Sequence, residues 1–245
     1  MAIELNSSRR KLARAKEHFA NLDSQIKAYV KEQPYVNVVE QDTQNADHLE
    51  HKIRLTKSLP EGLADAVGDT VGNLRSTLDH ATFALALANG LTEPRNAAFP
   101  FAGSKAEFEN ALKGRTKDVP QKYHGLIRTF EPYKGGNEVL WGLNMLCNAD
   151  KHRMLTPVGM GVRRAGMELE GSGWFSAPMN PEWDRAKNEI VYLTVHKDTK
   201  IRYNFPFKLF VVFEDIDPVG GERVDSILQQ TIVEVERVLT SIEAA

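Results

Sequence analysis

Arg75 and His80 are the residues whose types and spacing most directly suggest chemistry. A histidine side chain exchanges protons near neutral pH, and an arginine side chain stabilises phosphate charge through paired N–H donors. Together they would suit a site that acts on a phosphate, with His80 as general acid or base and Arg75 stabilising the phosphate charge. We therefore take Arg75 and His80 as the first candidate catalytic residues.

The pair lies in a segment, residues 61–88, that the sequence predicts to be a helix. Apolar side chains recur in it at spacings of three and four, the pattern of an amphipathic helix: Val67, Val71, Leu74, Leu78, Ala81 and Leu85. A polar row flanks them: Asp69, Asn73, Ser76 and His80. Side chains five residues apart on a straight helix point about 140° away from each other. Arg75 and His80 would therefore converge only through bending of the helix or across a dimer.

The same residues also have a purely structural interpretation. Arg75 and Asp79 are four residues apart, so they are placed to form an ion pair along one helix face. His80 would then be a partly buried histidine, hydrogen-bonded to Asn73 or to another helix. Under this interpretation the motif holds helices together and has no catalytic role.

A second group of candidate residues lies at the end of a helix predicted over 137–152: Asn148, Asp150, Lys151, His152 and Arg153. Its basic side chains offer charge-assisted donors, so the group predicts a phosphate or acidic-ligand site in which His152 assists catalysis. The same cations are also favourable at the negative end of a helix dipole and would then only stabilise the helix terminus. The sequence leaves both interpretations open.

The polar flanks of the two predicted helices would face a common cleft if both groups serve one site. Under that hypothesis the catalytic residues are Arg75, His80 and His152. The ligand-binding or phosphate-binding residues are then Asn73, Asp79, Asn148, Lys151 and Arg153. A buried hydrogen-bond network that joins two helices places polar residues in the same way. The competing hypothesis is a non-catalytic binding or protein-interaction module in which these residues are structural.

Composition places the chain among soluble globular proteins. Its formal charge of -2 over 245 residues gives no overall basic field, so contact with RNA or a nucleotide would require a local patch. Cys147 is the single cysteine, which excludes an internal disulfide and suits a reducing cytoplasm. Residues 1–16 lack the apolar run of a signal peptide. We expect a cytoplasmic protein without membrane contact, and no motif predicts a metal ion or cofactor.

The hydrophobic pattern predicts an α+β fold in a single domain over residues 1–245. A helical bundle would form mainly from residues 4–32, 61–152 and 221–243. Residues 35–57 and 153–214 would supply an antiparallel sheet, which begins with a hairpin.

The segment Arg75-Ser76-Thr77-Leu78-Asp79-His80 resembles the active motif of HEPN-domain proteins, in which four residues separate an arginine from a histidine. HEPN domains are helical bundles that include metal-independent ribonucleases. The resemblance implies a HEPN-like bundle and an RNA or nucleotide partner, and a homodimer would bring the two side chains together. Ser76 departs from the pattern, because many members carry Asn, Asp or His directly after the arginine.

Four ordered blocks resemble a family of uncharacterised bacterial proteins that carry NLRSALDH, FPI, QPY and DKHR segments. In this chain the blocks are residues 73–80, 99–101, 131–133 and 150–153. The resemblance covers roughly residues 60–156 and implies relatives without implying a mechanism. Phe101 and Glu131 stand where the family has Ile and Gln.

Overall fold

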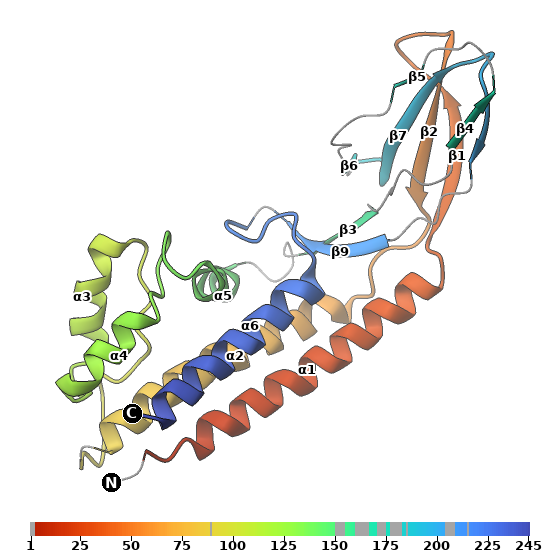
Figure 1. Cartoon of the computed structure of the whole chain (residues 1–245). Helices are drawn as coiled ribbons and strands as arrows, with labels where there is room; N and C mark the ends of the chain where they lie inside the picture. The colour runs from red at the N-terminus through yellow and green to blue at the C-terminus, as the bar shows by residue number, and fades with distance from the viewer. Residues whose placement is uncertain are drawn as a thin grey trace. The chain divides into compact units, whose positions relative to one another are not determined.

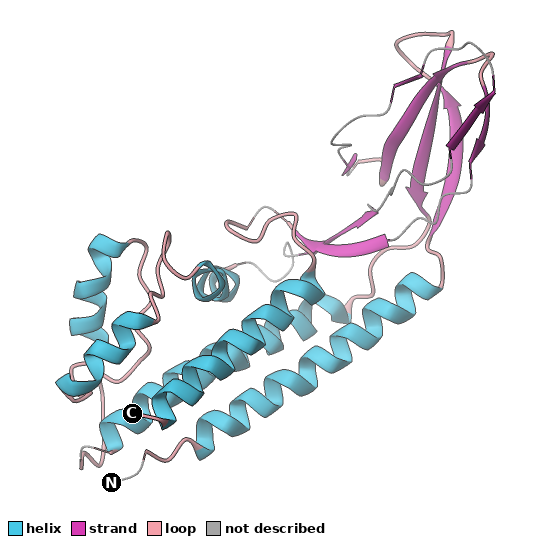
Figure 2. Cartoon of the chain, in the orientation of Figure 1, coloured by secondary structure: helices cyan, strands magenta, loops and turns pink. Residues whose placement is uncertain are grey.

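The computed structural model describes residues 3–88, 90–149, 155–159, 167–170, 175–176, 183–184, 186–203, 209–214 and 216–245. They form helices and antiparallel strands, which confirms the predicted α+β class (Figure 2). By its internal contacts the chain separates into two compact units. The helical unit contains Met1–Ser24, Glu61–Thr156 and Val212–Ala245, and the sheet unit contains Gln25–Pro60 and Pro157–Val211.

Three long helices form the centre of the helical unit: the first part of α1 (Asn6–Lys31), α2 (Gly62–Leu87) and α6 (Val224–Glu243). Figure 1 shows α2 and α6 side by side, and the two helices are in contact. Two contacts set the direction of α1. Ser7 near its start meets His80 of α2, and His18 meets Asp69 eleven residues earlier on α2. α1 is therefore antiparallel to α2.

Ion pairs place α1 against α6 in the same way. Arg9 pairs with Glu243 at the end of α6. Lys16, seven residues after Arg9, pairs at 3.1 Å with Glu236, seven residues before Glu243. α1 is therefore antiparallel to α6 as well, so α2 and α6 run parallel. The α2-facing and α6-facing side chains of α1 lie on opposite edges of its buried stripe.

The core of the helical unit consists of the apolar faces that helical periodicity predicts. Every apolar residue predicted on α2 is buried: Val67, Val71, Leu74, Leu78, Ala81 and Leu85. α6 contributes its own buried row, which includes Leu228, Val235, Val238 and Leu239. Burial of such side chains is the main source of folding free energy. Among the described residues, no helix combines the length and the apolar character needed to cross a bilayer.

Shorter helices complete the unit: α3 (Lys105–Arg115), the 3-10 turn η1 (Gln121–Tyr123), α4 (His124–Thr129) and α5 (Glu138–Asn148). Ser104 caps α3 by accepting a hydrogen bond from the Glu107 backbone N–H at 3.3 Å. Asn137 caps α5 in the same way through the Leu140 N–H at 3.1 Å. These caps fix where α3 and α5 begin.

The sheet unit is built on the predicted hairpin, β1 (Tyr35–Gln41) and β2 (His48–Leu55), whose antiparallel pairing is confirmed. β2 also pairs with β7 (Glu189–His196), which pairs in turn with β5 (Phe175–Ser176) and β6 (Trp183–Asp184). Two further pairs join β4 (Met167–Glu170) to β8 (Lys200–Tyr203) and β3 (Leu155–Gly159) to β9 (Leu209–Phe213). One face of the main sheet packs an apolar cluster that includes Ile53, Ile190, Leu193 and Val195.

A partly buried charge network occupies the other face of the main sheet. The ammonium of Lys52 lies 2.9 to 3.2 Å from the carboxylates of Glu40, Glu50 and Glu189. Arg54 pairs with Glu40 and with Glu189 at 2.7 and 2.6 Å. The side chains of Lys52 and Glu189 are only 6% and 3% exposed. Such a network fixes the register of β2 against β1 and β7.

Candidate functional site

Arg75 is held by three neighbours at the interface between α2 and α5. Its Nη1 donates a hydrogen bond to Asn144 Oδ1 on α5 at 2.7 Å. Its guanidinium carbon lies 4.0 Å from the ring centroid of Phe101, a cation–π distance. Its Nε lies 3.5 Å from Asp79 Oδ2, so the ion pair that the four-residue spacing predicts is present. The side chain is only 19% exposed.

Asp79 ties the same group to the backbone of the segment between α2 and α3. Its Oδ1 accepts a hydrogen bond from the Phe99 backbone N–H at 2.9 Å. One carboxylate therefore balances the charge of Arg75 and satisfies a backbone donor at once. We refer to Arg75, Asp79, Phe99, Phe101 and Asn144 as the Arg75 clamp.

Aromatic packing extends the clamp to the segment after α4. The rings of Phe99 and Phe130 are stacked with centroids 6.2 Å apart, and both side chains are almost fully buried. The Ala102 N–H donates to the Pro132 carbonyl at 3.2 Å, so the chain segments of the second and third blocks lie side by side. Three of the four blocks thus meet in one cluster.

His80 leaves α2 in a different direction from Arg75. Its Nδ1 lies 2.6 Å from the hydroxyl oxygen of Ser7 on α1. Arg75 contacts α5 and the Phe99–Phe101 segment, as the separation of about 140° between positions i and i+5 requires. Within one chain, therefore, Arg75 and His80 have different neighbours.

The remaining predicted site residues are only partly accounted for. Asn73 donates a hydrogen bond to the carbonyl of Asp69 in its own helix at 2.8 Å. Asn148 is the last residue of α5 and is exposed. Lys151, His152 and Arg153 lie outside the described residues, and so does Asp150. From the predicted polar flank of α5, the described structure brings Asn144 to Arg75.

Three residues of the Arg75 clamp, Phe99, Phe101 and Asn144, were not assigned by sequence to any site, and neither was Ser7, which contacts His80. Phe99 and Phe101 were noted only as part of the second block of the family resemblance. An aromatic residue beside a buried arginine has no local sequence signature. The one available signal was the position of Asn144 on the polar flank of its helix.

The single cysteine lies beside the clamp but is not suited to nucleophilic chemistry. Burial raises the pKa of the Cys147 thiol to about 11. Its sulfur lies 3.8 Å from the Val71 carbonyl. A thiol with this pKa is protonated at neutral pH, and only the thiolate is a strong nucleophile. In the part of the chain that the structure describes, His, Cys, Asp and Glu side chains form no group of three suited to a metal ion.

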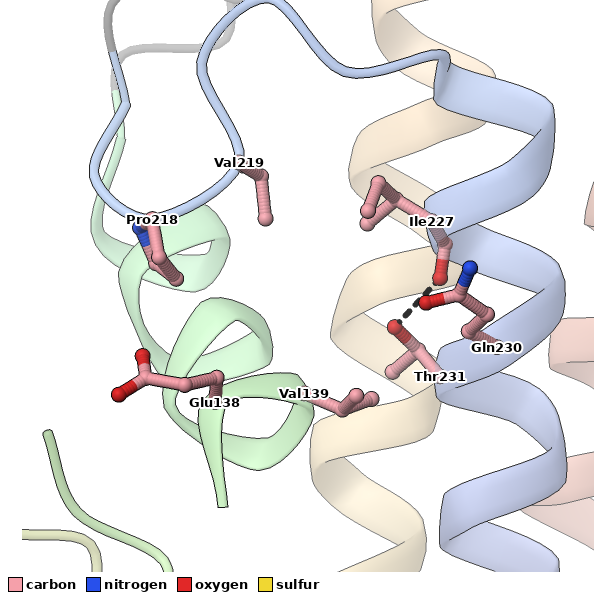
Figure 3. A pocket seen from close by; sticks show the side chains of 7 residues that line it. All are labelled: Glu138, Val139, Pro218, Val219, Ile227, Gln230 and Thr231. Atoms are coloured by element: carbon pink, nitrogen blue, oxygen red, sulfur yellow. Dashed lines mark hydrogen bonds between the residues drawn. The ribbon is translucent and has the colours of Figure 1, made fainter. Parts of the chain in front are cut away.

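A small pocket of about 130 Å³ lies elsewhere in the helical unit, between α5, α6 and the loop before α6 (Figure 3). Its lining is mainly apolar: Glu138, Val139, Pro218, Val219, Ile227, Gln230 and Thr231. The Thr231 hydroxyl is already bonded to the Ile227 carbonyl at 2.8 Å. None of the predicted site residues lines this pocket.

Comparisons of the chain with protein-family models, with curated proteins and with solved structures gave no significant match.

Proposed function

We propose that the helical unit is a non-catalytic binding module and that its Arg75–His80 motif is structural. The surroundings of Arg75 support this proposal most strongly. An arginine that stabilises a reacting phosphate must direct its N–H donors at that phosphate. Arg75 instead directs Nη1 at Asn144, lies against Phe101 and faces the carboxylate of Asp79. That carboxylate would also repel a phosphate.

The direction of His80 supports the same proposal. A general acid or base must reach the phosphodiester that the arginine stabilises. The imidazole of His80 is oriented by Ser7 on the α1 side of α2, whereas the guanidinium of Arg75 lies on the α5 side. His80 contributes to the contact of α2 with α1, and Arg75 contributes to the contact of α2 with α5. These structural roles account for both residues without a catalytic role.

The competing function is a metal-independent ribonuclease of the HEPN type. It requires Arg75 and His80 to act on one phosphate, either after release of Arg75 from its partners or across a homodimer. RNA is then a substrate, and removal of either side chain abolishes cleavage without unfolding the protein.

An RNA cleavage assay in EDTA separates these functions. We would compare the wild-type protein with Arg75→Ala, His80→Ala and the control Arg128→Ala, which removes an exposed arginine paired with Glu109. We expect no cleavage above background by any of them, and a lowered Tm for Arg75→Ala but not for Arg128→Ala. Cleavage by wild type that is lost in folded Arg75→Ala and His80→Ala, and kept in Arg128→Ala, would overturn the proposal.

A further inference from the structure

The pocket between α5 and α6 has walls from three segments of the helical unit (Figure 3). Val139 of α5 points toward the α6 side of the pocket, where Ile227 and Thr231 lie. Pro218 and Val219, in the loop before α6, form the third wall. A ligand in the pocket would therefore contact side chains that are far apart in the sequence and are brought together only by the fold.

The loop that forms the third wall is fixed by contacts within the loop and to α5. The Val219 N–H donates a hydrogen bond to the Ile216 carbonyl at 2.6 Å. Asp217 pairs at 2.6 Å with Lys134, which precedes α5. The loop also packs closely on α5, since a Cβ atom added at Gly142 would lie 3.1 Å from Val219 Cγ1. These contacts need no ligand, so the pocket, with a volume of about 130 Å³, is preformed.

Two uncharged polar side chains interrupt the apolar lining. The hydroxyl of Thr231, a buried residue, donates to the Ile227 carbonyl at 2.8 Å and keeps only its acceptor lone pairs. The Gln230 amide forms no hydrogen bond with the described part of the chain, so it can both donate and accept one. Because Gln230 is exposed, its amide lies at the mouth of the pocket. The lining therefore suits an apolar ligand that carries one hydrogen-bonding group.

The charge at the pocket disfavours an acidic ligand. Glu138 is the charged residue of the lining, and its Oε1 accepts a hydrogen bond from the Gly135 N–H at 2.7 Å. Figure 3 shows that carboxylate directed away from the other lining side chains. Asp217, next to Pro218, is paired with Lys134 and adds no net charge. An anion would be repelled by Glu138, and any charge buried against the apolar walls would lose its hydration, so a neutral ligand is favoured.

We propose that this pocket binds a neutral molecule of about the size of benzene that carries one hydroxyl group. Its volume of about 130 Å³ is close to that of engineered apolar cavities of about 150 Å³ that bind benzene. The apolar body of the ligand displaces water from Val139, Val219 and Ile227, and this burial supplies most of the affinity. The hydroxyl group forms a hydrogen bond with the Gln230 amide, which gives preference over an unsubstituted ring. The pocket contains no residue of the Arg75 clamp, so the site goes beyond the proposed function.

Ligand-observed NMR titrations of the full chain test the site, with phenol as the probe and benzoate as its anionic counterpart. Val139→Phe places a ring inside the pocket, and the control Val233→Phe places the same ring at an exposed position of α6. We expect phenol to bind the wild-type protein and Val233→Phe equally. Binding should weaken about tenfold or more in Val139→Phe, and benzoate should not bind.

A second pair of variants tests the hydrogen bond without filling the pocket. Gln230→Leu removes the amide at the mouth, and the control Gln229→Leu makes the same change at an exposed neighbour outside the lining. Phenol binding should weaken about fivefold in Gln230→Leu and stay unchanged in Gln229→Leu. Benzene binding should not weaken in either variant, because benzene forms no hydrogen bond with the amide.

Three outcomes would overturn the proposal: no phenol binding by wild type, phenol binding that folded Val139→Phe or Gln230→Leu leaves unchanged, and benzoate binding as tight as that of phenol. Circular dichroism shows whether each variant is folded, and Gln230→Leu decides the matter if Val139→Phe is unfolded. Phenol binding and RNA cleavage are measured separately, so failure of this site is distinguishable from failure of the proposed function.

Discussion

Replacing Asp79 with alanine should destabilise the helical unit far more than loss of an exposed carboxylate does. Asp79 accepts the Phe99 N–H at 2.9 Å and balances Arg75. Loss of a hydrogen bond to a charged group costs about 1.5–3 kcal/mol, and an i,i+4 helix pair adds about 0.3–0.5 kcal/mol. Because the Asp79 side chain is 35% exposed, the lower part of the range applies. We expect the free energy of unfolding to fall by about 2 kcal/mol.

Urea titrations followed by far-ultraviolet circular dichroism measure this loss. The matched control is Glu109→Ala, because the Glu109–Arg128 pair is exposed on both sides and is expected to contribute less than about 1 kcal/mol. Asp79→Asn keeps an oxygen that can accept a hydrogen bond from the Phe99 N–H. The free energy of unfolding should therefore fall in Asp79→Asn by about half as much as in Asp79→Ala. Equal losses in Asp79→Ala and Glu109→Ala would refute the structural role of the Arg75 clamp.

Three further predictions concern other groups. The raised pKa of Cys147, about 11, predicts slow labelling by a thiol reagent at mildly alkaline pH in the native protein and fast labelling in urea. Burial alone would raise the pKa of Glu234, but hydrogen bonds from Arg237 and Asn137 outweigh it and lower that pKa below its ordinary 4.5. The stability that ionised Glu234 contributes is therefore fully present above pH 4.5 and is lost as the pH falls through the pKa of the folded state. In thermal melts, the Tm of Glu234→Gln should fall less on acidification than the Tm of the wild-type protein. Lys52→Ala removes the buried ammonium of the charge network and leaves Glu189 paired with Arg54 alone, so the variant should lower the stability of the sheet unit against urea by about 1–3 kcal/mol.

Local patterns in the sequence were sufficient to predict the α+β class, the buried face of α2 and the hairpin of β1 and β2. The three- and four-residue spacing from Val67 to Leu85 depends only on the geometry of one helix, and each predicted side chain is buried. The ion pair of Arg75 and Asp79 is equally local, because it needs only their four-residue separation. The hairpin of β1 and β2 follows from two extended segments joined by a short polar loop.

The partners that decide the role of the motif are not local. Asp79 accepts a hydrogen bond from the backbone N–H of Phe99. Every residue except proline carries a backbone N–H, so the sequence does not show which one will bind the carboxylate. Whether Ser7 caps its helix or meets His80 depends on the register of α1 against α2, which is set by packing of their apolar faces. Helical geometry alone predicted that Arg75 and His80 diverge, but only the packed helices show which neighbour each side chain contacts.

Because Arg75 and His80 contact different elements, their substitutions should be energetically independent. We expect the destabilisation of the double variant Arg75→Ala/His80→Ala to equal that of the two single variants added together, within about 0.5 kcal/mol. The comparison is a double-mutant cycle of Arg75→Ala and Asp79→Ala, whose side chains face each other at 3.5 Å. These two positions should show a coupling energy of more than about 0.5 kcal/mol. Urea titrations of the variants measure both cycles. Coupling above about 1 kcal/mol between positions 75 and 80 would mean that the two side chains share one network, and the separation of the motif into two independent helix contacts would then be wrong.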